Sequence, residues 1–283
     1  MPFLLEPLGA DFFLRALLGG VLAATICAVA GTWVVLRGNA FLGEAIGHGM
    51  LPGVAAAALV GASPVLGAAA SATAMSAGIS WLGRRGRLSD DTAIGVVFVG
   101  MLALGVVLVS GSRSFATDLT AILFGDILAI GTADIALLAV GLMVVAALAA
   151  VLRRPFVAAT FDDRLASTLG LGTRTARFGM TALITIAVVA SYRAVGTLLV
   201  VALLVAPPAA ALLWARSVAR IMLGAAVLGS LSVCCGLLLS WHAGTAAGAS
   251  VAIVATLLFL GALALRGVRD RLRVPTAPVG VSA

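Results

Sequence analysis

The sequence contains no lysine and carries little charge of any kind. All 18 basic residues of the 283 are arginine, and charged residues make up 10% of the chain, against about 25% in a typical soluble domain. A P-loop needs a lysine for the nucleotide phosphates, and a pyridoxal phosphate enzyme needs one for its Schiff base. The polypeptide therefore has no P-loop and no pyridoxal phosphate site of its own, and its composition excludes a soluble globular enzyme.

Side chains that perform covalent or metal chemistry are also scarce. The three cysteines, Cys27, Cys234 and Cys235, lie in apolar runs without the spacing of a metal knuckle, so we interpret them as small apolar residues. The two histidines are His48 and His242. An intramembrane enzyme needs a nucleophile beside a base, and no serine or cysteine lies at helical spacing from His48. Catalysis is therefore the least favoured of the function classes.

Long apolar runs dominate what remains, since 62% of the residues are hydrophobic. About nine stretches are close to the ~20 residues that a helix needs to cross a bilayer. They are residues 16–36, 41–60, 64–82, 92–109, 127–152, 175–192, 195–214, 221–241 and 245–265. A single helix over 175–214 would be about 60 Å long, so we expect a break near Tyr192, Arg193 and Gly196. The pattern predicts an all-α polytopic membrane protein with one domain.

The positions of the arginines predict the orientation of these spans. With the N-terminus outside, 15 arginines fall on the cytoplasmic side and three on the outer side, as the positive-inside rule requires. This distribution explains the net charge of +7 without a nucleic-acid partner. We expect residues 1–15 to form an external, partly interfacial segment that is not a cleaved signal. Residues 16–273 would form the transmembrane domain, and 274–283 a disordered cytoplasmic tail.

Small residues in two of the spans predict close helix packing. Gly43 and Gly47 are four residues apart, and Gly95, Gly100 and Gly105 recur along another span. Glycine at such positions lets helix backbones approach each other in lipid. The alternative is that glycine simply fills an apolar helix in a chain that is rich in it.

One apolar stretch contains an ionisable pair. Glu44 and His48 are one helical turn apart, so they share a helix face, and such groups within a span normally face a cavity or a partner. Carboxylate and imidazole are ligands for Zn²⁺ or Mn²⁺, and Pro52 and Gly53 predict a kink just beyond them. The sequence favours a metal pathway here; the alternative is a solvated or structural pair near the cytoplasmic end.

His242 follows Trp241 at the end of a later span. A tryptophan–histidine pair at that position is typical of the membrane interface, and a ligand role in the pathway is the second interpretation.

The longest cytoplasmic loop contains a predicted short helix near 160–171. Thr160 is a candidate N-cap with Asp163 as its capping-box acid, and Leu165 and Leu169 form an apolar stripe. A helix of two or three turns is not stable alone in water, so it should pack on a cytoplasmic partner, on its own bundle or on the lipid surface.

These residues resemble a known family, the membrane permease subunit of ABC-type zinc, manganese and iron uptake systems. Five segments carry the resemblance in order and spacing: Gly43–Gly53, Asp91–Phe98, Leu123–Leu128, Phe161–Leu171 and Val195–Pro207. The resemblance implies a vitamin B12-importer-like (type II) fold that works as a homodimer, with two cytoplasmic ATPase subunits and an extracytoplasmic metal-binding protein. It implies a non-catalytic subunit of the plasma or inner membrane, with no bound cofactor and with ATP used by the partner.

The resemblance also assigns residues to roles. Glu44 and His48 would line the metal pathway, and the coupling helix that fits the ATPase would include Phe161, Asp162, Asp163, Leu165, Ala166, Leu169 and Gly170. Residues 241–248 depart from the family's pattern before the last span, and His242 would compensate there. The sequence leaves open which metal is carried. A second function class also stays open, an ATP-independent secondary carrier in which Glu44 and His48 form a proton relay.

Overall fold

The computed structural model describes residues 6–85, 89–110, 125–161 and 173–272, and within these ranges the chain is helical without any β-strand. Its elements are η1 (Glu6–Gly9), α2 (Asp11–Leu36), α3 (Ala40–Gly49), α4 (Leu51–Leu59), α5 (Pro64–Arg85), α6 (Asp90–Ser110), η2 (Ile127–Ala129), α8 (Thr132–Val151), α9 (Arg153–Phe161), α11 (Thr173–Leu212), α12 (Val218–Ala243) and α13 (Ala247–Leu272).

Seven helices in the described part of the chain are long and apolar enough to cross a membrane: α2, α5, α6, α8, α11, α12 and α13. The prediction of an all-helical, multi-pass membrane protein is confirmed. The predicted break in the longest stretch is also present, because Gly196 has φ 78° and ψ 159° inside α11. Only glycine adopts such a backbone readily, so α11 consists of two helices joined end to end.

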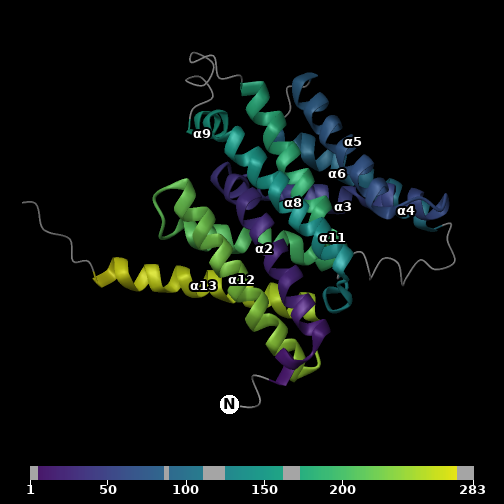
Figure 1. Cartoon of the computed structure of the whole chain (residues 1–283). Coiled ribbons are helices and arrows are strands. Elements are labelled where there is room, and N and C mark those ends of the chain that lie inside the picture. The colour runs from purple at the N-terminus through teal and green to yellow at the C-terminus, as the bar shows by residue number, and fades with distance from the viewer. Residues whose placement is uncertain (1–5, 86–88, 111–124, 162–172, 273–283) are drawn as a thin grey trace, which may run out of the picture.

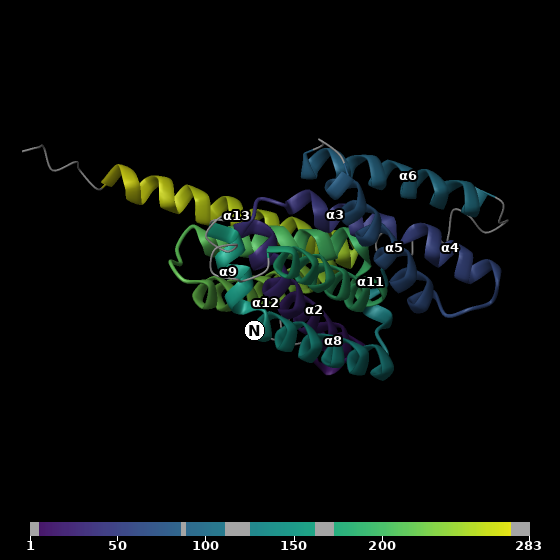
Figure 2. The same cartoon turned by 90° about the horizontal axis from the view of Figure 1, so that it is seen from above.

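The core of the bundle forms around α2 and α11. The helix α11 contacts most of the other helices, and its most extensive contact is with α2, which also packs against α3, α8 and α12. The two helices lie near the centre of both views (Figure 1, Figure 2). Gly31 allows them to approach closely, because a Cβ atom there would meet the backbone carbonyl of Leu204. Large apolar side chains such as Leu223 and Leu257 are exposed on the outer helices α12 and α13, as expected of surfaces that face lipid.

The predicted glycine contacts divide into two groups. Gly43 packs against Leu204, and a Cβ atom at Gly105 would lie 2.9 Å from Leu51. Gly95 and Gly100 have no atom of the described chain within 4 Å of the position that a Cβ would take. Gly43 and Gly105 therefore allow close packing between helices of this chain, while Gly95 and Gly100 lie on an open face of α6.

The closest contact between α4 and α5 supports a stability prediction. Gly53 and Gly67 face each other, and a Cβ on either would meet the other's carbonyl oxygen. Gly67→Ala should lower the thermal midpoint of the purified protein by about 2–10 °C, since two backbones would have to separate. Gly100→Ala is the matched control and should leave the midpoint equal or higher. Equal midpoints for Gly67→Ala and the wild type would contradict this packing.

The helix α9 differs from the predicted loop. It follows α8 directly, and Phe156 and Ala159 are buried in the bundle. The prediction that Thr160 caps a new helix is wrong, because Thr160 lies in the last turn of α9 and its hydroxyl donates to the Phe156 carbonyl at 2.7 Å. Thr160 thus lies inside α9 and is not the first residue of a helix.

Candidate metal pathway

The second predicted span is an interrupted helix. α3 ends at Gly49, Met50 lies in a turn, and α4 begins at Leu51 with Pro52 in its first turn, where the missing proline N–H is not needed. The hydroxyl of Ser71 on α5 donates to the Gly49 carbonyl at 2.7 Å. A side chain of a neighbouring helix therefore satisfies a carbonyl at the end of α3, which stabilises the break inside the bundle.

Two faces of α3 have different environments. Gly43 faces Leu204, and Gly47 faces Thr197 and Val201, all three on α11. The other face carries three residues that we call the α3 stripe: Phe41, Glu44 and His48. Phe41 and Glu44 are exposed and His48 is half-buried. The glycines thus let α3 pack closely on α11 while Glu44 and His48 point away from the chain's own core.

An aromatic ring from α6 borders the α3 stripe. The ring of Phe98 lies 5.6 Å from that of Phe41 and 6.0 Å from that of His48, in edge-to-face geometry in both cases. Neither Glu44 nor His48 has a hydrogen bond or an ion pair with another described residue. A carboxylate and an imidazole are therefore presented on an apolar helix without a polar partner from the described chain, an arrangement that is costly unless another group meets them.

The ligands of the α3 stripe do not form a complete metal site within the described residues. No group of three or more histidine, cysteine, aspartate or glutamate side chains is close enough there to hold a metal ion. Structural zinc sites have four ligands, and Mn²⁺ takes more. This part of the chain thus supplies at most a pair of ligands at one place.

His242 is not brought together with the α3 stripe. It is exposed near the end of α12, where its Nδ1 lies 2.8 Å from the Leu238 carbonyl of the same helix. Its neighbour Trp241 contacts the rings of Phe12 and Phe13, with ring centres 6.0 Å apart in both pairs. This environment is an aromatic cluster where α2 begins and α12 ends, and it resembles an interfacial belt.

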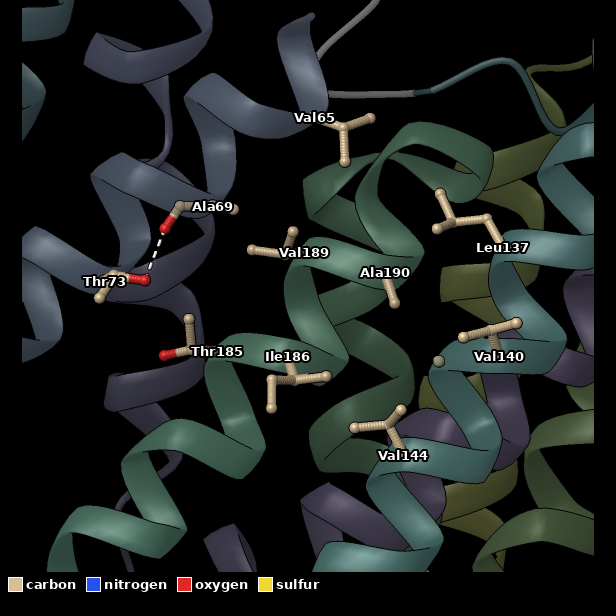
Figure 3. Close-up of a pocket in the computed structure, with 11 residues that line it drawn as sticks. Val65, Ala69, Thr73, Leu137, Val140, Val144, Thr185, Ile186, Val189 and Ala190 are labelled. Atoms are coloured by element: carbon tan, nitrogen blue, oxygen red, sulfur yellow. Dashed lines mark hydrogen bonds between the residues drawn. The ribbon is translucent and has the colours of Figure 1, made fainter.

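A separate crevice of about 270 Å³ lies between α5, α8 and α11. Figure 3 shows aliphatic side chains along most of it, with the hydroxyls of Thr73 and Thr185 toward one end. The Thr73 hydroxyl donates to its own helix at the Ala69 carbonyl, 2.7 Å away. The lining includes no carboxylate, imidazole or thiol, so this crevice does not suit a divalent transition metal.

The family model described as "ABC 3 transport family" matches residues 9–266. The chain belongs to this family. It is 35% identical over 248 residues to the manganese transport system membrane protein MntC of Listeria innocua, covering 88% of both chains. It is 34% identical over 270 residues to an iron transport system membrane protein of Haemophilus influenzae, covering 95% of this chain and 99% of the relative.

Two solved structures have the same fold as this chain. PsaBC from Streptococcus pneumoniae, solved in complex with a Fab, matches with a TM-score of 0.82 and 29% identity, covering 92% of this chain and 94% of that chain. A metal-chelate type ABC transporter in an inward-facing conformation matches with a TM-score of 0.73 at 13% identity. The chain is therefore a multi-pass membrane protein of the ABC 3 transport family, as the motifs indicated.

Most of the coupling-helix residues expected from the family resemblance lie outside the described residues. Phe161 is the last residue of α9, while Asp162, Asp163, Leu165, Ala166, Leu169 and Gly170 fall in the range 162–172. The structure places α9, which leads into that range, against α11 and against the end of α2, where Phe156 contacts Trp33 and the Ala159 carbonyl accepts from Arg37. The role of the segment stays a prediction.

Sequence reasoning missed two contacts of the ABC 3 motifs. One is Phe98 against His48, although Phe98 ends a segment that carried the resemblance. The other joins two such segments: a Cβ atom at Gly125 (φ +63°) would meet the backbone at Gly196. Beside this contact, Arg193 Nε lies 3.3 Å from the Asp134 carboxylate. Glycines in both motifs were the available signal, but their spacing in sequence does not reveal that they meet.

Proposed function

We propose that this chain is the ion-conducting, non-catalytic subunit of an ATP-driven importer of divalent transition-metal ions, Mn²⁺ or Zn²⁺. The observation that carries the proposal is the α3 stripe, where Glu44 and His48 are presented without a polar partner among the described residues. The names of the relatives, which refer to manganese and iron transport, support a transition metal as cargo. They make Mn²⁺ the first ion to test.

The incomplete ligand set supports a homodimer. In a symmetric pair, a residue near the two-fold axis meets its own copy. Two α3 stripes facing each other would supply two carboxylates and two imidazoles, a set of donors that suits Zn²⁺ or, with water, Mn²⁺. The pathway in this proposal runs between the two copies, and Phe98 forms part of its wall. Pro52 and Gly53 lie where the interrupted helix changes direction along the path, and His242 lies at its outer end.

The orientation in this proposal places the N-terminus outside and the C-terminus in the cytoplasm, with about nine spans. Contacts of arginine side chains support the proposal that α2, α11 and α13 end on the same side of the membrane, the cytoplasmic side. Arg266 donates to the Leu213 carbonyl at 3.3 Å and Arg269 lies over the Trp214 ring at 4.9 Å. Leu36, the last residue of α2, packs into the same small cluster as Ala215. The ends of α2, α11 and α13 therefore meet, and the arginines near them lie at one end of the bundle.

Energy in this proposal comes from separate ATPase subunits that bind the 162–172 segment, and the ion is delivered by an extracytoplasmic metal-binding protein. The chain contains no lysine, so a P-loop must come from another polypeptide. We propose that the permease holds no cofactor of its own.

Reconstitution into lipid vesicles tests this proposal against a secondary carrier. Vesicles that contain the chain alone should accumulate no ⁵⁴Mn, with or without a pH gradient. Vesicles that also contain the ATPase and the binding protein should accumulate it when ATP is supplied to the ATPase side. Accumulation by the chain alone, driven by protons, would contradict the proposal and favour the secondary carrier.

A further inference from the structure

Arg37 joins three helices at the end of α2. Its Nη2 donates to the Ala159 carbonyl of α9 at 3.1 Å, and its Nη1 lies 3.8 Å from the Met180 sulfur of α11. The side chain is half-buried between these elements. A single guanidinium therefore connects residues that are 122 and 143 positions away in the sequence.

The contact with Ala159 is at the end of α9. The last four carbonyls of a helix have no N–H donor within that helix, and a cation there also interacts favourably with the helix dipole. Ala159 is the third-last residue of α9, so the guanidinium caps the end of the helix that leads into residues 162–172. A charged donor makes this hydrogen bond stronger than a neutral one.

The rest of α9 is attached rigidly to the same helices. The rings of Phe156 and Trp33 lie 5.2 Å apart in edge-to-face geometry, and both side chains are fully buried. At Gly179 of α11, a Cβ atom would lie 3.3 Å from the Phe156 ring. Because these contacts leave little space, a displacement of α9 must be transmitted to α2 and α11.

Arg37 also begins the turn into α3. Its backbone N–H donates to the Trp33 carbonyl at 3.2 Å, and the N–H of Asn39 donates to the Val34 carbonyl at 3.0 Å. Gly38, with φ 71°, allows the chain to reverse between them. α3 starts at Ala40, and Glu44 follows within its second turn. The turn that Arg37 opens is thus short and hydrogen-bonded, and it leads directly to the α3 stripe.

We propose that Arg37 is a positioning residue that couples the ATPase-facing end of α9 to the helix that carries Glu44 and His48. This inference rests on the proposed function. When the ATPase moves the segment that follows α9, the Arg37–Ala159 hydrogen bond transmits the movement to the α2–α3 turn. Without this bond, ATP would still be hydrolysed but fewer metal ions would be moved per ATP.

The test compares variants in vesicles that contain the full complex with its ATPase and binding protein. Arg37→Ala and Arg37→Gln should keep assembly and ATP hydrolysis, while the number of ⁵⁴Mn ions moved per ATP falls by at least about tenfold, the factor expected for the loss of a hydrogen bond to a charged group. Arg37→Lys keeps one charged donor and should recover most of the ratio. Arg220→Ala removes an exposed arginine of α12 and is the matched control. The rate of hydrogen exchange at the α9 amides should rise in Arg37→Ala and stay unchanged in Arg220→Ala.

Each contrary outcome has a distinct meaning. An unchanged ratio of metal to ATP in Arg37→Ala would overturn the proposal for Arg37 and leave the proposed function intact. Loss of assembly in Arg37→Ala, Arg37→Gln and Arg37→Lys alike would assign Arg37 a merely structural role and would also overturn it. Failure of the wild-type complex to move Mn²⁺ or Zn²⁺ would instead overturn the proposed function.

Discussion

Replacing Glu44 and His48 together by alanine is expected to abolish metal uptake while the protein is made and inserted normally. Glu44 is exposed and His48 is half-buried on the face of α3 that points away from α11, and neither has a polar partner among the described residues. Their removal therefore leaves no buried group unsatisfied. Losing an outer partner of a metal ligand already costs about 10- to 100-fold, so loss of the ligands themselves should reduce uptake by at least about 100-fold. The measurement is ⁵⁴Mn or ⁶⁵Zn accumulation by cells in which this is the sole importer.

Two variants sharpen this prediction. Phe41→Leu changes the α3 stripe but keeps both ligands. Asp270→Ala removes an exposed carboxylate in the last turn of α13, one that forms an ion pair with Arg266. Both should retain uptake close to that of the wild type. Normal accumulation in the Glu44/His48 double variant would exclude a pathway role for the pair.

Introducing an arginine at Leu169 is expected to separate the permease from its ATPase. Leu165 and Leu169 form the apolar stripe of the predicted coupling helix. A short helix of this kind gains its stability by burying that stripe against a partner. Placing a charge in such an interface is strongly unfavourable. Leu169→Arg should therefore abolish co-purification with the ATPase and metal-stimulated ATP hydrolysis together.

The matched control adds the same charge on the opposite side of the predicted helix. Ser167 is about 200° around a helix from both Leu165 and Leu169. Ser167→Arg should leave co-purification nearly unchanged. If Leu169→Arg retained both assembly and stimulated hydrolysis, the proposed docking role of this segment would be wrong.

The helical bundle was largely predictable because the hydrophobic requirement of a membrane span is local. Each apolar stretch coincides with helix in the structure, and the break in α11 followed from length, since one helix over 175–214 would be twice as long as the bilayer is thick. The interruption after His48 was predictable for a similar reason, because Pro52 cannot continue a helix without loss. These features depend on neighbours in sequence.

The contacts that give the site its character depend on residues far apart in sequence, and these were not predictable. Residues 153–161 were assigned to the longest cytoplasmic loop because the apolar stretch before them ends at residue 152, and Arg153 and Arg154 follow it. The segment is nevertheless helical, since a proline is tolerated in the first turn of a helix, and its Phe156 is buried against Trp33, a contact that the sequence alone does not reveal. In the same way, the i, i+4 spacing of Glu44 and His48 showed a shared face but not that this face is open.

The number of Mn²⁺ ions moved per ATP hydrolysed, in vesicles that contain the complete complex, tests the central claim most directly. The wild-type complex and the Glu44/His48 double variant are compared at the same ATP concentration, with hydrolysis and ⁵⁴Mn accumulation measured in the same sample. A pathway through the α3 stripe predicts that the variant still hydrolyses ATP but that its ⁵⁴Mn accumulation falls to the level of empty vesicles. Equal ratios of Mn²⁺ to ATP in the two complexes would contradict it.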